Sequence, residues 1–234
     1  MSRRRIDAVG VLVPAHDEED LVGPCVRSVL AALAVAGRPA AVCVLADRCT
    51  DATVRRARAA VSGAALPAVV HEDRSGGTIG ALRNRAAEAA LARLDADPER
   101  TWLLSTDADG TVDPGWVRAH LDPAAAGADA VAGGVALDLP GRPAPPGEPP
   151  LPDHPVYGAN LGLRAGPFLS VGGFPDIACG EDHGIVARLR AAGYRVAHGA
   201  PGTVCTSART TGRARDGLAD LLGSPVRADQ RVGA

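Results

Sequence analysis

The chain has 234 residues and a formal net charge of −2; 46% of its residues are hydrophobic and only 3% are aromatic. This length suits one α/β domain of ordinary size with a core of Ala, Val and Leu. The near-neutral charge gives no support for a nucleic-acid partner, for which a clustered basic patch is expected.

The cysteines and the N-terminus indicate where the protein works. The five cysteines are odd in number and have no zinc-finger spacing, which favours reduced thiols in a cytoplasmic protein. The basic residues 3–5 precede a short apolar run that is broken by Pro14, His16 and Asp17. This pattern predicts neither a signal peptide nor a membrane span.

Strand-like and helix-like segments alternate through the first half of the chain. Short continuous apolar runs predict buried parallel strands, and apolar residues at helical spacing predict the helices between them. The predicted strands cover residues 8–13, 40–46, 68–71 and 102–106, and the predicted helices cover residues 21–35, 50–62 and 78–94. Thr50 is a candidate N-cap for the second helix. The alternation predicts an α/β fold with a mostly parallel central sheet and helices on both faces.

The pattern changes after Asp113. Helices are predicted near residues 114–121, around Phe168 and over residues 182–192, with strands over residues 130–137, 160–163 and 195–198. The segment Pro140 to Pro155 is rich in proline and glycine and predicts a long surface loop. Both a disordered connector and an acceptor-side loop are compatible with that composition.

The whole pattern predicts a single domain over residues 1–222. We expect a donor-binding half at about residues 6–113 and an acceptor or catalytic half at about residues 114–222. The segment 223–234 has little to bury and is expected to form a disordered tail.

Carboxylates follow each of the first four predicted strands. These strand ends carry the side chains Glu18, Asp47, Glu72, Asp107 and Asp109, and a Ser75-Gly76-Gly77-Thr78 turn leads into the third helix. Ligands of open α/β sheets bind beyond the carboxyl ends of the strands. Each carboxylate alone is compatible with helix capping or solvation, but together they predict an acidic rim for a metal-bound nucleotide.

The Asp107-Ala108-Asp109 step is the most informative of these strand ends. In an extended segment alternate side chains point the same way, so both carboxylates are expected to face one point. Such a pair can hold a hard divalent cation that also contacts substrate phosphate oxygens. A solvated acidic turn is the alternative interpretation.

Four sequence motifs follow one another along the chain and carry a further indication of function. They are the segments Val11 to Glu19 (VLVPAHDEE), Leu45 to Thr53 (LADRCTDAT), Asp107 to Asp109 (DAD), and Tyr157 to Arg164 running through Gly172-Gly173-Phe174 to Gly180-Glu181-Asp182. Together they resemble the family 2 glycosyltransferases, enzymes of the A-type nucleotide-diphospho-sugar transferase fold. The resemblance covers roughly residues 8 to 200.

The resemblance implies a set of donor-binding residues, namely Pro14, Ala15, His16, Glu18, Asp47, Gly77, Arg83, Asp107 and Ala108. Within it, Pro14, Ala15 and Glu18 line the nucleoside pocket and Asp47 accepts a hydrogen bond from the base. Asp17 stands where the family usually has Asn, which leaves its role open. Gly77 and Arg83 lie at the start of a helix, where backbone can approach phosphate closely. A solvated helix position is the alternative interpretation of Arg83.

The resemblance also implies metal and catalytic residues. Asp109 is the expected ligand of Mg²⁺ or Mn²⁺, with Asp107 binding ribose or the same cation. Asp182, with Glu181 beside it, matches the general base of inverting members, and stabilisation by the helix dipole is the simpler interpretation. His198 is more typical of a structural histidine.

A late arginine-containing stretch is a further candidate for phosphate contact. It includes Arg209 and Arg213, and arginine is suited to bidentate phosphate binding. A solvated tail has the same composition.

The sequence therefore predicts a hexosyltransferase that moves a sugar from a UDP- or GDP-sugar to an unknown acceptor hydroxyl, with inversion or retention left open. One alternative is a catalytically degenerate nucleotide-sugar-binding protein. A second is a sugar nucleotidyltransferase, which usually has a glycine-rich basic loop after the first strand. Residues 14–19 are acidic and lack glycine, which disfavours that class.

Overall fold

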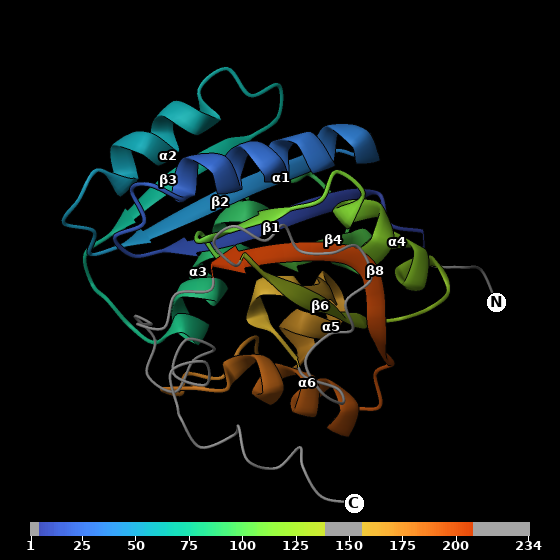
Figure 1. Ribbon diagram of the computed structural model, residues 1–234. Helices are drawn as coiled ribbons and strands as arrows, with labels where there is room; N and C mark the ends of the chain where they lie inside the picture. Colours follow the sequence, from blue (N-terminus) through green and yellow to red (C-terminus); the bar gives the residue numbers. More distant parts are fainter. Residues whose placement is uncertain (1–4, 139–155, 208–234) are drawn as a thin grey trace, which may run out of the picture.

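The structure, a computed structural model, describes residues 5–138 and 156–207. Its strands form one sheet in the order β3-β2-β1-β4-β7-β6-β8-β5 (Figure 1). The strands are β1 (Ala8–Ala15), β2 (Ala40–Asp47), β3 (Ala68–Asp73), β4 (Thr101–Ser105), β5 (Gly110–Val112), β6 (Ala130–Asp138), β7 (Leu161–Arg164) and β8 (Val196–Ser207). The helices are α1 (Val22–Ala36), α2 (Thr53–Val61), α3 (Ile79–Leu91), α4 (Trp116–Ala125), α5 (Ala165–Ser170) and α6 (Glu181–Ala191), with short 3₁₀ turns η1 (Pro98–Arg100) and η2 (Gly158–Asn160).

The mostly parallel sheet is confirmed. Strands β3, β2, β1 and β4 pair in parallel, as do β6 and β8. The antiparallel pairs are β4 with β7, β6 with β7 and β5 with β8. Because β1, β2, β3 and β4 run in one direction, the polar residues that follow them collect at one edge of the sheet.

Helices cover both faces of the sheet, as predicted (Figure 1). One core cluster packs apolar residues of α1, α2 and α4 on β1 and β2, with Val11, Val26 and Trp116 among its members. The other packs α3, α5 and α6 on the opposite face, with Leu12, Phe174 and Ile185 among its members. Each strand of the centre is thereby buried on both sides, which explains why its sequence is a continuous apolar run.

Among the element boundaries that differ from the sequence prediction, two have a clear physical cause. Helix α2 starts at Thr53 with Ala52 as its N-cap, so Thr50 is not the cap; its amide and hydroxyl bond the Asp17 carboxylate instead. Strand β8 extends to Ser207, far beyond the predicted end at His198, because it pairs with both β6 and β5.

Other predictions fall outside the described residues. These are the loop Pro140 to Pro155, the arginines Arg209 and Arg213, and the tail 223–234. Within residues 5–138 and 156–207, no helix has the length and apolar character needed to cross a bilayer.

Candidate active site

The loops that follow β1 and β2 are joined by hydrogen bonds from backbone amides to carboxylates. The Asp17 carboxylate accepts from the amides of Thr50 (2.6 Å) and Asp51 (3.3 Å), and the Thr50 amide bond lowers the pKa of Asp17. Glu19 accepts from the Ala52 amide, and the Glu19 amide donates to Asp51, both at 3.1 Å. Part of the predicted acidic rim therefore fastens two loops together.

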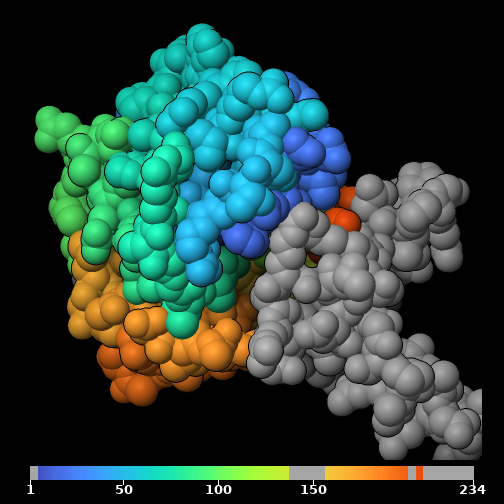
Figure 2. All heavy atoms as spheres, turned by 90° about the vertical axis from the view of Figure 1, so that its left-hand side faces the viewer, coloured from blue at the N-terminus to red at the C-terminus, as the bar shows by residue number. Residues whose placement is uncertain are grey.

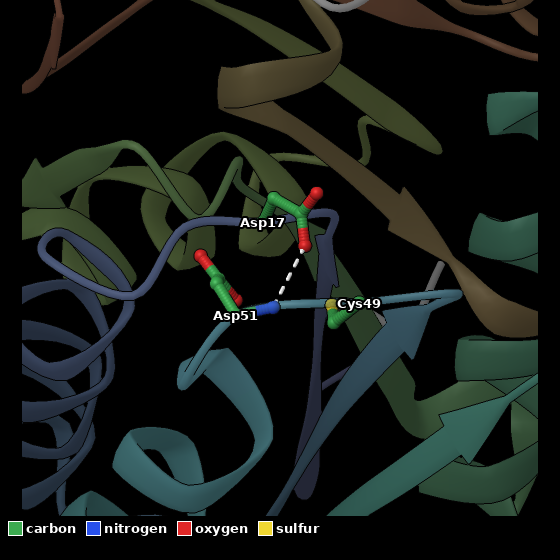
Figure 3. Close-up of side chains that lie close together, drawn as sticks. All are labelled: Asp17, Cys49 and Asp51. Carbon is green, nitrogen blue, oxygen red and sulfur yellow. Dashed lines mark hydrogen bonds between the residues drawn. The ribbon is translucent and has the colours of Figure 1, made fainter.

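Asp17, Cys49 and Asp51 form the one group of three metal-capable side chains found in the described part of the chain (Figure 3). Their ligand atoms lie within 4.8 Å of one another. The Cys49 thiol donates to the Ala15 carbonyl (3.6 Å), and burial raises the pKa of that thiol. A metal ligand must be a thiolate, so these contacts describe a structural junction between the loops.

The nucleoside-pocket residues implied by the sequence lie at the ends of β1 and β2. The Asp47 carboxylate is buried and accepts hydrogen bonds from Nε and Nη2 of Arg48 at 3.1 to 3.3 Å. Nδ1 of His16 contacts the Asp47 carbonyl oxygen at 2.6 Å. Glu18 is buried, and its amide donates to Thr53 Oγ1 at 2.6 Å. The residues that follow β1 and β2 are thus brought together.

The Asp107-Ala108-Asp109 step follows β4 but is not extended. It lies in a turn closed by a hydrogen bond from the Gly110 amide to the Asp107 carbonyl (3.2 Å), so the extended conformation predicted for this step is wrong. Asp109 accepts from Thr206 Oγ1 on β8 at 3.4 Å. A small hollow beside Asp109 is lined by residues of α1, β5 and β8.

The chemistry of this turn fits a divalent cation shared with a ligand. Asp107 and Asp109 offer hard carboxylate oxygens and are partly exposed. Within the described residues they belong to no group of three His, Cys, Asp or Glu ligands. Mg²⁺ is typically held by one or two carboxylates together with substrate phosphates, which is the arrangement that two aspartates can complete.

Arg83 on α3 connects the two parts of the site. Its side chain is only 3% exposed, and its Nε donates to Ser105 Oγ (2.9 Å) while Nη2 donates to Asp107 Oδ1 (2.6 Å). Its Nη1 donates to Glu181, and its guanidinium lies 5.8 Å from the ring centre of Phe174. Burial opposes the charged form, but Asp107 and Glu181 outweigh it and raise the pKa of Arg83.

Glu181 and Asp182 begin α6 and face different surroundings. Glu181 is buried, and burial raises the pKa of its carboxyl group, although the neighbouring Arg83 guanidinium acts to lower that pKa. Asp182 is half-buried; its Oδ2 accepts from the Gly158 amide (2.9 Å) and its Oδ1 from the His183 amide (2.7 Å). Asp182 is therefore the more accessible carboxylate of the two.

The start of α3 borders the segment that leads into α6 (Figure 2). Thr78 caps α3 by accepting from the Ala81 amide (3.2 Å), and its hydroxyl donates to Asp176 Oδ1 (2.6 Å). Asn84 pairs with both the amide and the carbonyl of Phe174, each at 2.9 Å. Gly77 has a φ of 147° in the turn before the cap. These contacts hold the segment before α6 against α3.

A buried polar network supports the Asp182 side of the site and was not identified from the sequence. Asn160 Oδ1 accepts from Trp116 Nε1 and His120 Nε2, each at 2.8 Å, and Asn160 Nδ2 donates to the Gly134 carbonyl (2.7 Å). Asn160 ends the η2 turn that also contains Gly158. The only available signal was the presence of a rare Trp and a His four residues apart on one helix.

Comparison with known proteins gives a family match and a shared fold. A family model described as Glycosyl transferase family 2 matches residues 10–143, more than half of the chain. No curated protein matches the sequence significantly.

The fold is shared with solved structures of low sequence identity. S. aureus TarS 1-349 in complex with UDP-GlcNAc is 18% identical, with a TM-score of 0.62 over 88% of this chain and 60% of that one. The mannosyltransferase PcManGT from Pyrobaculum calidifontis, in complex with GDP-Man and Mn2+, is 16% identical, with a TM-score of 0.64 over 89% and 59%. GalNAc-T7 with UDP, GalNAc and Mn2+ is 12% identical, with a TM-score of 0.65 over 86% and 44%. The chain spans less than two thirds of the length of each.

Proposed function

Because the chain belongs to glycosyl transferase family 2, we propose that it transfers a hexosyl group from a nucleotide-diphosphate sugar to an acceptor hydroxyl. The observation that carries the proposal is the position of Arg83, which bonds Asp107 of the donor-side turn and Glu181 of the α6 segment. Two carboxylate groups from distant parts of the chain are thereby held at one edge of the sheet, where both donor and acceptor are needed.

The donor side is assigned to the ends of β1, β2 and β4. Pro14, Ala15, His16 and Glu18 are proposed to line the nucleoside pocket with Asp47, and Asp107, Ala108, Gly77 and Arg83 to border the ribose and diphosphate. The solved structures with UDP-GlcNAc and GDP-Man support a nucleotide-sugar donor. Since the Arg83 guanidinium is buried among carboxylates, its proposed effect on the donor is to orient Asp107.

The metal is assigned to Asp109, with Asp107 beside it. A bound Mg²⁺ or Mn²⁺ would neutralise charge on the leaving diphosphate. Mn2+ in two of the similar structures supports metal dependence. The Thr206 hydroxyl bonds Asp109 Oδ1 and thereby orients that carboxylate, and the turn closed by Gly110 holds its backbone.

Asp182 is assigned as the general base of an inverting reaction. Two amide donors, from Gly158 and His183, stabilise its carboxylate and fix its direction. A partly exposed carboxylate can accept the proton of an attacking hydroxyl. Glu181 supports this residue from the next position, because its pairing with Arg83 holds the start of α6 in place.

The remaining parts of the proposal concern organisation and location. We assign residues 1–222 to one glycosyltransferase domain, with the donor half ending near Asp113. A cytoplasmic location is supported by the odd number of cysteines. The acceptor is an unidentified alcohol or sugar.

The test is turnover by variants of the metal site. Asp109→Ala is expected to abolish metal-dependent donor hydrolysis and transfer while circular dichroism stays unchanged. Asp95→Ala is the matched control, because Asp95 is an exposed carboxylate before β4, at the opposite edge of the sheet.

Donor screening by mass spectrometry with UDP- and GDP-sugars supplies the assay. Wild-type turnover by Asp109→Ala would refute the metal assignment. Metal-dependent nucleotide binding by the wild type without turnover of any donor would instead support a nucleotide-sugar-binding protein.

A further inference from the structure

Arg48 has a strained backbone in an exposed position. Of the non-glycine residues in the described chain, only Asp17 and Arg48 have positive φ, at 50° and 43°. Such a conformation costs about 1–2 kcal/mol for a residue with a Cβ. The hydrogen bonds of Asp17 to the neighbouring loop account for its conformation. Arg48 has a side chain that is 56% exposed, so burial of apolar surface does not account for its conformation.

What Arg48 does contact is the buried carboxylate of Asp47. Its Nε lies 3.2 and 3.3 Å from the two carboxylate oxygens, and its Nη2 lies 3.1 Å from Oδ2. The Asp47 side chain is 5% exposed. In the described residues, the hydrogen bonds to this carboxylate come from Arg48. A largely exposed arginine therefore bonds a buried carboxylate.

A neighbouring glycine leaves room for the Arg48 guanidinium. A Cβ on Gly76 would lie 2.9 Å from Arg48 Nε and 3.0 Å from its Cζ, so the guanidinium packs directly on that glycine. Gly76 also has a positive φ of 73°, which favours glycine. The pair lies at the carboxyl edge of β2, beside β1, where an α/β sheet binds its ligands.

We propose that Asp47 and Arg48 together read the nucleobase of the donor and select uracil over guanine. The inference rests on the proposed function, which supplies the nucleotide donor. Uracil has one ring N–H between two carbonyls, so it needs one acceptor and an adjacent donor. Asp47 supplies the acceptor, and the exposed Arg48 guanidinium supplies the donor.

Guanine makes a different demand on the same pair. Its ring N–H and its amino group point the same way and together need two acceptor oxygens side by side. Oδ1 of Asp47 accepts one hydrogen bond from Arg48 and Oδ2 accepts two, so a single N–H can still bond Oδ1. Guanine needs both oxygens, so it has to displace the guanidinium and leave it without its partner. Losing such a charge-assisted contact costs about tenfold in affinity or more.

The experiment measures UDP and GDP binding by calorimetry in the presence of Mn²⁺. The variant is Arg48→Asn, because Asn tolerates positive φ while removing the cation. Arg48→Gly is the second variant, since glycine adopts this backbone without strain. Arg74→Asn is the matched control: Arg74 follows the neighbouring strand β3, is 85% exposed and pairs with Glu72.

The wild type and Arg74→Asn are expected to bind UDP at least about tenfold more tightly than GDP. Both Arg48 variants are expected to reduce that ratio by about tenfold, through weaker UDP binding and stronger GDP binding. If thermal melting shows that Arg48→Asn is unfolded, the ratio measured for Arg48→Gly decides.

Two results separate this inference from the proposed function. Binding of both nucleotides with a ratio that does not respond to Arg48, or a wild-type preference for GDP, overturns the base-reading pair alone. Failure of the wild type to bind either nucleotide with Mn²⁺ overturns the proposed function and this inference with it.

Discussion

Removing the charge of Arg83 should cost the protein a large part of its stability. In Arg83→Met the aliphatic stem is largely kept, but Glu181, whose side chain is 8% exposed, becomes a buried carboxylate without its ion-pair partner. Breaking a buried ion pair in this way costs about 3–5 kcal/mol. The free energy of unfolding of a whole domain is typically about 5–15 kcal/mol. Asp107 adds less, because its side chain is 37% exposed and water can solvate it.

Urea denaturation followed by circular dichroism measures this cost. Adding Glu181→Gln to Arg83→Met removes the stranded charge and should recover about 2 kcal/mol or more, which a double-mutant cycle detects as coupling. Arg74→Met is the control, since its exposed pair with Glu72 is worth less than about 1 kcal/mol. If Arg83→Met loses less than about 1 kcal/mol of unfolding free energy, or if the two substitutions are simply additive, then Arg83 does not stabilise the fold by pairing with the buried Glu181.

Burial lowers the pKa of His120 to about 4 from its ordinary 6.5. His120 therefore stays neutral in the folded state at a pH between these values, whereas in the unfolded chain it takes up a proton below pH 6.5. Stability should therefore be full above pH 6.5 and fall by about 2 kcal/mol by pH 5; an equal pH-dependent loss in wild type and His120→Gln would contradict this. A Cβ on Gly80 would lie 2.3 Å from the Pro175 carbonyl oxygen, so Gly80→Ala should cost about 1–3 kcal/mol despite better helix propensity. In Gly23→Ala the new methyl meets only the flexible end of Arg27, so unfolding in urea should show no loss and a gain of up to about 1 kcal/mol.

The first half of the fold follows from its hydrophobic pattern. The strands β1, β2 and β4 are buried on both faces, and a strand of that kind must be a continuous apolar run. Strand β5 was not predicted, because Gly110–Val112 is three residues long and depends on pairing with β8. The extension of β8 beyond His198 has the same origin in tertiary pairing.

The candidate site was located more reliably than its contacts. Polar residues after parallel strands must lie at one edge, so the positions of Asp47 and Asp107 follow from the sequence. The partner of each side chain does not follow: Asp47 bonds the adjacent Arg48, and Asp107 bonds an arginine on α3. The burial of Arg83 depends on Glu181, which lies 98 residues further along the chain.

That separation has a consequence for biosynthesis. A ribosome adds about 5–20 residues per second, so roughly 5–20 seconds pass between the synthesis of Arg83 and that of Glu181. During this interval Asp107, made 24 residues after Arg83, is the earlier of its two carboxylate partners. The nascent N-terminal half thus carries a cation whose native burial awaits the α6 segment. Completion of this edge of the sheet is thereby coupled to late translation, and a chain that ends before α6 cannot assemble it.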